Sequence, residues 1–197
     1  MPRTSEPDAS GASGGADMPN GATQTRVAVL TISDAGARGE RQDTSGDAIE
    51  RWSRDRGYDL AARALVPDES VQIVSTLCSW CDSDTADLVV TTGGTGLSPR
   101  DVTPEATRAV LDRDAPGIAE RIRALSLVSF PRAALSRGLS GVRKRTLIIN
   151  LPGSPSGVHD GLTALAPIID HAIAVLRADR LDHDAPFHRS TVPPFHR

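Results

Sequence analysis

Short apolar runs along the chain alternate with segments in which apolar residues recur every three or four positions. The runs favour buried strands, and the recurring segments favour amphipathic helices. Strands are predicted at 26–32, 58–66, 87–90 and 145–150, and helices at 44–56, 70–81, 104–112, 118–128 and 158–176. Pro167 lies inside the last helical pattern and is expected to kink or split it, while residues 131–141 are ambiguous.

This alternation of strands and helices predicts an α/β fold, a three-layer sandwich whose mostly parallel sheet is covered by helices on both faces. One domain is expected over residues 25–177. Residues 1–24 are rich in Ala, Gly, Ser, Pro and Asp, which predicts a disordered N-terminal tail. Residues 178–197 are expected to form a separate C-terminal tail. Aromatic residues make up only 3% of the chain, so the core is expected to be mainly aliphatic.

Composition and charge exclude several classes of partner. The formal net charge is −3 and the isoelectric point is about 5.9, so the chain lacks the basic footprint of a nucleic-acid-binding protein. No apolar run approaches the roughly 20 residues of a membrane-spanning helix. The N-terminus has no apolar stretch typical of a secretory signal, which favours a cytoplasmic protein.

The most informative segment is the glycine-rich stretch 91–105, which joins the third predicted strand to a helix. Its three glycines let backbone N–H groups approach an anion, and Asp101 is suited to hold a hard cation such as Mg²⁺. Thr103 is a candidate N-cap, followed by Pro104 at the first helical position. The spacing is that of neither a P-loop nor a dinucleotide-binding loop. An ordinary tight connection is the alternative interpretation.

Four polar loops follow the four predicted strands, and the carboxyl ends of parallel strands meet at one edge of a sheet. They contribute Ser33 with Asp34, Asp68 with Glu69, residues 92–101 and residues 150–154. We therefore expect these loops to converge on one site. Taken singly, each could be only a turn or a helix cap. Thr44 or Ser45 and Ser70 are the caps expected for the first two helices.

The two cysteines form a C-x-x-C pair, Cys78 and Cys81, within a predicted helix. A redox dithiol or half of a zinc site are the functional interpretations. The pair falls late in the helix, and no other cysteine is present to complete a zinc site. Val71 and Val74 share the spacing of the two cysteines, so we expect one apolar helical stripe with two small buried thiols.

Residues 91–105 resemble the signature of the molybdopterin-binding fold, in particular the molybdopterin adenylyltransferases of the Mog and MoaB type, which are similar to one domain of gephyrin. Further segments resemble that family in the same order along the chain, over roughly residues 25–176. They are 29–34, 43–46, 66–69, 134–137 and 150–155. The resemblance implies a Rossmann-like fold and a homotrimer. It also implies a separate molybdate-insertion protein as a possible partner.

The resemblance implies an enzyme of molybdenum cofactor biosynthesis. The terminal phosphate of molybdopterin attacks the α-phosphorus of ATP with the help of Mg²⁺, and pyrophosphate leaves. Asp101 and Asp68 match the family's two acidic positions, so Asp101 is the expected Mg²⁺ ligand and Asp68 a second ligand or a nucleotide-positioning residue. The expected substrate-binding and nucleotide-binding residues are Ser33, Thr92, Gly93, Gly94, Thr95, Gly96, Asn150, Pro152, Gly153 and Ser154. Arg100 could compensate phosphate charge.

Two other functions remain open from the sequence. The first is a carrier or scaffold that holds molybdopterin without adenylylating it. The second is a pyridine-nucleotide amidohydrolase of the competence-damage type, a family that resembles this one around the glycine loop but typically carries a second domain.

Three of the five histidines, His183, His188 and His196, lie in the C-terminal tail. There, a solvated tail or packing on a neighbouring subunit is favoured over metal binding, because the spacing fits no standard ligand pair.

Overall fold

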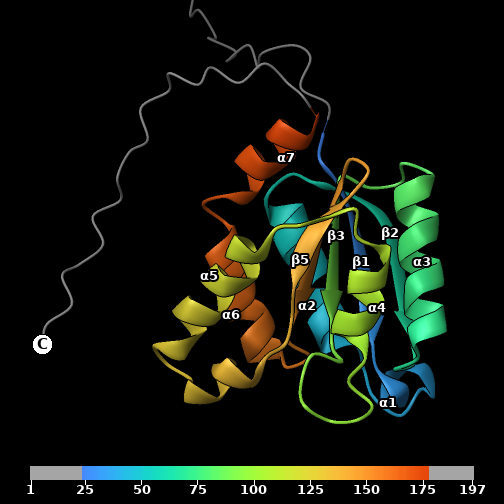
Figure 1. Ribbon diagram of the computed structural model, residues 1–197, viewed down its shortest axis with the longest axis vertical. Helices are drawn as coiled ribbons and strands as arrows, with labels where there is room; N and C mark the ends of the chain where they lie inside the picture. Colours follow the sequence, from blue (N-terminus) through green and yellow to red (C-terminus); the bar gives the residue numbers. More distant parts are fainter. Residues whose placement is uncertain (1–23, 178–197) are drawn as a thin grey trace, which may run out of the picture.

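The computed structural model describes residues 24–177, which form a six-stranded sheet in the order β2-β1-β3-β6-β5-β4 (Figure 1). The strands are β1 (Arg26–Ile32), β2 (Asp59–Val66), β3 (Leu88–Thr92), β4 (Arg113–Asp114), β5 (Ser140–Arg143) and β6 (Thr146–Leu151). β2, β1, β3 and β6 are mutually parallel, and β5 and β4 add an antiparallel edge. The mostly parallel sheet is confirmed, whereas β4 and β5 were not predicted. The predictions for the tails, including the three tail histidines, lie outside the described residues.

Helices cover both faces of this sheet (Figure 1). They are α1 (Asp34–Ala37), α2 (Thr44–Asp55), α3 (Ser70–Asp82), α4 (Thr103–Val110), α5 (Pro116–Leu127), α6 (Pro155–Leu165) and α7 (Ile169–Arg177), with a 3-10 helix, η1 (Pro131–Leu135). α2, α5, α6 and α7 pack on one face, and α3 and α4 pack on the other. The predicted three-layer α/β sandwich is therefore confirmed. The chain divides between α6 and α7 at Pro167, as expected.

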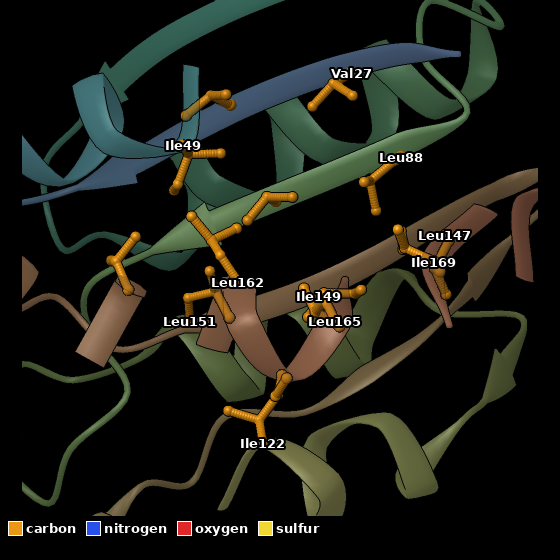
Figure 2. Close-up of a cluster of buried hydrophobic side chains, with 14 of the residues drawn as sticks. Val27, Ile49, Leu88, Ile122, Leu147, Ile149, Leu151, Leu162, Leu165 and Ile169 are labelled. Carbon is orange, nitrogen blue, oxygen red and sulfur yellow. The ribbon is translucent and has the colours of Figure 1, made fainter. Parts of the chain in front are cut away.

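The core follows the two-residue period of the strands. In β1, Val27 and Val29 face the layer of α2 and α6, while Ala28 and Leu30 face α3 and α4. Figure 2 shows the first of these clusters, in which Ile149 of β6 and its neighbours meet the side chains of α6. Each fully buried aliphatic side chain contributes about 1.5–3 kcal/mol relative to exposure. The central strands are therefore a rigid platform for the loops that follow them.

The first two helices begin differently from the prediction. Asp43 caps α2, because its carboxylate accepts a hydrogen bond of 2.8 Å from the backbone of Gly46, so the expected caps Thr44 and Ser45 are wrong. α1 is a short helix in a segment predicted to be a loop. Both features belong to the loop after β1. The carboxylate of Asp43 is a stronger cap than a hydroxyl one residue later, and it fixes the start of α2 beside that loop.

α3 begins at Ser70, the first residue of the predicted helix, whereas α4 begins at Thr103, one residue before the predicted start. Glu69 is the N-cap residue of α3 and Val102 that of α4, and neither makes a side-chain cap bond. The expected caps Ser70 and Thr103 instead occupy the first helical position. Thr103 is fully buried, and its hydroxyl has no hydrogen-bond partner within residues 24–177. A buried hydroxyl without a partner is costly, which marks the start of α4 as unusual.

The cysteine pair lies on α3, but the predicted stripe is not the buried one. Val71 is 80% exposed, and the face against the sheet carries Ile73, Leu77 and Cys81, at intervals of four residues. Both thiols are free, with Cys81 buried and Cys78 half-buried. Burial raises the pKa of Cys81 to about 11, so this thiol stays protonated at neutral pH. A packing role is therefore favoured for the pair.

Candidate functional site

The loops after β1, β2, β3 and β6 surround the point where the strand order reverses. From β1 the chain crosses through α2 to β2 and then through α3 to β3, which lies on the opposite side of β1. α2 and α3 lie on opposite faces of the sheet, so a crevice opens beyond the carboxyl ends of β1 and β3. The predicted convergence of polar loops follows from this topology.

Two carboxylates from different loops bind each other's backbone at this crevice. The N–H of Asp34 donates to Asp68 Oδ2 at 2.9 Å, and the N–H of Asp68 donates to Asp34 Oδ1 at 3.0 Å. The hydrogen bond from Asp68 and the guanidinium of Arg100 lower the pKa of Asp34. Burial, together with the charges of Asp34 and Asp101, raises the pKa of Asp68. Arg100 is engaged by Asp34, at 2.9 Å, while more than half of its side chain remains exposed.

The glycine loop requires glycine at two consecutive positions. Gly93 has φ of 101° and Gly94 has φ of 61°, backbone conformations that other residues rarely adopt. A Cβ at Gly93 would lie 2.1 Å from the carbonyl oxygen of Ile32. A Cβ at Gly94 would lie 2.3 Å from the Thr103 hydroxyl and 2.8 Å from Asp68 Oδ1. The loop thus packs directly on the carboxylate of the β2 loop and on the start of α4.

Three backbone donors of this loop are available for a ligand. The N–H of Gly93 already donates to the carbonyl of Leu151 at 3.3 Å. The N–H groups of Gly94, Thr95 and Gly96 donate no hydrogen bond within the described part of the chain. Successive unpaired N–H groups in a tight turn form an anion-binding concavity. Three of the four loop residues expected to cradle a phosphate therefore have free donors.

Arg137 holds the same loop from outside. Its backbone N–H donates to the carbonyl of Thr95 at 2.8 Å, its Nε to that of Gly96 at 2.6 Å, and its Nη2 to that of Asp101 at 2.5 Å. The guanidinium also forms an ion pair with Glu105. The sequence pattern placed Arg137 in a motif without assigning it a role, because its partners lie more than 30 residues earlier. Its carbonyl contacts keep the loop's opposite, N–H-bearing side unobstructed.

The loop after β6 joins the site through its backbone. Thr92 donates its hydroxyl to the carbonyl of Pro152 at 2.7 Å, and Ser45 donates to the carbonyl of Gly153 at 3.0 Å. Ser154 caps α6 by accepting from the backbone of Gly157. These bonds place the predicted residues 152–154 beside the glycine loop and fix their orientation.

Asn150 lies below the site instead of within it. It is 3% exposed, and its amide donates to the hydroxyls of Thr91 and Thr107, at 2.9 and 3.0 Å. Its oxygen accepts from the backbone of Leu139 at 3.2 Å. Every polar atom of this side chain is thus used to join β3, β6, α4 and the segment before β5. The structure does not bring the Asn150 amide to either cavity described below.

One cavity of about 470 Å³, which we name the polar cavity, occupies the crevice. The loop after β1 and the start of α2 line it together with the loops after β2, β3 and β6. It contains most of the predicted site residues, namely Ser33, Asp68, Thr92, Gly93, Gly94, Asp101, Gly153 and Ser154. The predicted convergence of these residues is thus present in the structure.

A second cavity of about 500 Å³, the apolar cavity, lies on the other side of the glycine loop. Thr95, Gly96 and Pro152 line it, and its apolar wall comes from α5 and η1. Ile122, Phe130, Ala133 and Leu135 form that wall. The sequence predicted a helix over 118–128 but left residues 131–141 ambiguous, and the one visible signal there was the pair of apolar residues Phe130 and Leu135. Phe130 and Leu135 are about half exposed, at 47% and 51%, which is unusual for side chains of this size.

The two cavities share one wall made of Gly94, Asp101, Gly153 and Ser154. A carboxylate thus stands where two bound ligands could meet. Asp101 Oδ2 accepts the N–H of Ser98 at 2.8 Å, which fixes the carboxylate within its loop. This arrangement suits the transfer of a group between two ligands held side by side.

The donor set fits Mg²⁺. Asp68 and Asp101 both line the polar cavity, and Mg²⁺ is usually held by one or two carboxylates together with substrate phosphates. Residues 24–177 contain no group of three or more His, Cys, Asp or Glu side chains placed to hold a metal ion. A complete protein-made metal cage, including a zinc site at the cysteines, is therefore not what this part of the chain provides.

Within the same residues, no helix is both long and apolar enough to span a bilayer.

Comparison with known proteins decides the family. Residues 28–171 match the model of the family described as "Probable molybdopterin binding domain". The chain belongs to this family. The expectation drawn from residues 91–105 and the ordered segments around them is confirmed. Molybdopterin-binding domains of this kind therefore provide the reference for the two cavities.

Curated and solved relatives agree with this assignment. The chain is 44% identical over 140 residues to the molybdopterin adenylyltransferase of Escherichia coli K12, covering 70% of this chain and 71% of the relative. It is 40% identical over 154 residues to the enzyme of the same name from Helicobacter pylori J99, covering 76% and 86%. The solved molybdopterin biosynthesis enzyme MoaB from Thermus thermophilus is similar with 51% identity and a TM-score of 0.75, covering 79% and 98%. The expected enzyme class, a nucleotidyltransferase of molybdenum cofactor biosynthesis, is confirmed by these relatives.

Proposed function

We propose that this chain transfers AMP from ATP to the terminal phosphate of molybdopterin, in a Mg²⁺-dependent reaction that releases pyrophosphate. The observation that carries the proposal is the wall shared by the two cavities, where Asp101 stands beside the glycine loop. Adenylyl transfer requires two phosphate-bearing substrates to meet at one phosphorus atom. The names of the curated relatives support the same reaction.

The substrates divide between the cavities by their chemistry. The apolar wall of Ile122, Phe130 and Leu135 suits the flat heterocycle of molybdopterin. The polar cavity, with its carboxylates and backbone donors, suits the phosphates of ATP with their metal ion. The free N–H group of Gly94 is available to a phosphate at the shared wall, and that of Thr95 is available beside it on the side of the apolar cavity. Such chemistry depends mainly on positioning and on charge neutralisation.

Asp101 and Asp68 would hold the Mg²⁺ ion, which supplies charge neutralisation to the phosphates when it is bound. Burial, and after it the charges of Asp34 and Asp101, raise the pKa of Asp68, and a cation there would offset the repulsion between these carboxylates. The chain's own part is to keep these groups in place. The reciprocal hydrogen bonds of Asp34 and Asp68 join the loops after β1 and β2, and the hydrogen bonds of Arg137 hold the glycine loop in place.

Pyrophosphate release tests the proposal directly. Wild type, Asp101→Asn and Glu120→Gln are compared in the presence of ATP, Mg²⁺ and molybdopterin. Glu120 is exposed on α5 and lines neither cavity, so it is the matched control for removing a carboxylate. We expect Asp101→Asn to lower kcat by about 100-fold or more, as for the loss of one preorganised charge contact, and Glu120→Gln to leave it unchanged.

A carrier or scaffold is the competing function. Tight binding of molybdopterin by the wild type without any pyrophosphate release would contradict the transferase and support the carrier. Equal release by wild type and Asp101→Asn would remove Asp101 from the mechanism. The homotrimer and a molybdate-insertion partner also remain proposals. Light scattering of the full chain measures the first, and co-purification with such a protein tests the second.

A further inference from the structure

The loop between α1 and α2 places Arg41 in the lining of the polar cavity. Its guanidinium makes no hydrogen bond, ion pair or ring contact within residues 24–177. Asp43, Asp68 and Asp101 line the same cavity, so its charged side chains are otherwise acidic. Arg41 is thus an unpaired cation in a cavity whose other charged side chains are all carboxylates.

The neighbouring arginines are already engaged. Arg63 is bound by Asp43 at 2.9 Å and by two further carboxylates of α2. Arg100 is bound by Asp34, and Arg137 by carbonyls of the glycine loop. Arg63 also neutralises Asp43, which therefore does not compete for Arg41. Among the described residues that line the polar cavity, Arg41 is the one arginine, and its donors are free for a ligand.

We propose that Arg41 binds the β- and γ-phosphates of ATP, the part that leaves as pyrophosphate. This inference rests on the proposed adenylyl transfer. The α-phosphorus must lie at the shared wall, where molybdopterin can reach it. Arg41 lines the polar cavity but is absent from the shared wall and from the apolar cavity. It can therefore reach the end of ATP that points away from the second substrate.

The chemistry of the step explains the need for this cation. An oxygen of the molybdopterin phosphate bonds to the α-phosphorus while the bond to the α,β-bridging oxygen breaks, and that oxygen keeps the electron pair. Negative charge therefore grows on the departing pyrophosphate. A guanidinium offers paired N–H donors in a planar fork that matches phosphate oxygens, and it transfers no proton. Asp68 and Asp101 would otherwise repel the same charge.

Equilibrium binding separates this contact from catalysis. Calorimetry of the full chain measures Kd for ATP, for inorganic pyrophosphate and for AMP, each with Mg²⁺, in wild type and two variants. Arg41→Gln is the test, and Arg51→Gln is the matched control, because Arg51 is exposed on α2 and lines no described cavity. We expect Arg41→Gln to weaken ATP and pyrophosphate by about 10- to 100-fold, the range for a charge-assisted hydrogen bond. AMP binding should change less than about twofold, and Arg51→Gln should bind all three ligands as the wild type does.

Kinetics gives a second readout. Arg41→Gln should lower kcat/KM for ATP by about the same factor while KM for molybdopterin stays unchanged, and Arg41→Lys should recover part of the loss. Unchanged pyrophosphate affinity in Arg41→Gln would overturn the inference even if the enzyme proved to be a transferase. An equal loss of AMP affinity would also overturn it, since the contact would then be at the α-phosphate. If wild type bound pyrophosphate through Arg41 but released none from ATP, the proposed reaction would fail while the contact stood.

Discussion

Replacing Gly94 with alanine tests the packing on which the whole site depends. Gly94 has φ of 61°, and its missing Cβ would point at the Thr103 hydroxyl, 2.3 Å away, and at Asp68 Oδ1, 2.8 Å away. Both distances are shorter than non-bonded atoms tolerate. Gly94→Ala must therefore displace the start of α4, the carboxylate of the β2 loop, or the glycine loop itself.

Two costs set the size of the effect. A residue with a Cβ in the left-handed region costs about 1–2 kcal/mol. Forcing an extra methyl group into a packed site costs a further 1–3 kcal/mol or so. We therefore expect Gly94→Ala to lower the free energy of unfolding by roughly 2–5 kcal/mol. Displacement of Asp68 should also reduce the rate of pyrophosphate release.

Gly39 provides the control, because it has φ of 73° but open space around its missing Cβ. Gly39→Ala should show the backbone cost alone, about 1 kcal/mol in urea unfolding at 25 °C. Adding Thr103→Ala to Gly94→Ala removes the nearer contact atom, so the two effects should be less than additive. Equal destabilisation by Gly94→Ala and Gly39→Ala would refute the argument, since no contact beyond the backbone strain would then exist.

Two further predictions concern buried polar groups. Thr103→Val should leave the free energy of unfolding, measured with urea, unchanged or raise it by about 1 kcal/mol, because it removes a buried hydroxyl without a hydrogen-bond partner. A clear loss of stability would show that this hydroxyl does have a hydrogen-bond partner. Burial by itself would raise the pKa of Asp87. Hydrogen bonds from Arg26 and Arg177 lower this pKa by more than burial raises it, so the folded pKa lies well below the usual range. Asp87→Asn should therefore lower the free energy of unfolding by about 3 kcal/mol at pH 7, measured by urea unfolding. The difference from wild type should shrink as the pH falls below about 4, because the carboxyl of the unfolded wild type becomes protonated there. A difference that does not depend on pH would contradict this prediction.

The central strands and their loops could be predicted because their signals are local. The run 88–90 is apolar throughout, and two threonines and then the glycines follow it, so strand and loop are both visible in a short window. β4 has only two residues, both exposed, and β5 carries just one large apolar residue, Val142. β5 forms by pairing with β6 across a two-residue turn, and β4 forms by pairing with β5, which is distant from it in sequence. No local period marks them, so the antiparallel edge was missed.

The difference between local and long-range signals also explains which residues around the candidate site were predicted and which were missed. Asp68 lies just after β2 and Asp101 lies in the loop that follows β3, so the topology brings their two loops to the same edge of the sheet. Arg137 and Phe130 reach the site from a segment without a clear period, and only the folded chain shows their partners. Asn150 is a different case. Its place after β6 suggested ligand contact, but the surrounding threonine hydroxyls use its amide fully.

Gly94 connects these observations, because it belongs to the wall between the two cavities and also packs against Asp68 and Thr103. The carboxylate of the β2 loop, the start of α4 and the surfaces of both cavities therefore depend on one backbone position. A loop with more conformational freedom would let the cavities vary independently, and two substrates would then meet at variable distances. Since misplacement by about 1 Å can cost a reaction roughly 100-fold, the left-handed glycine conformation and the Arg137 contacts are best understood as means of fixing the distance between the substrates of the proposed transfer.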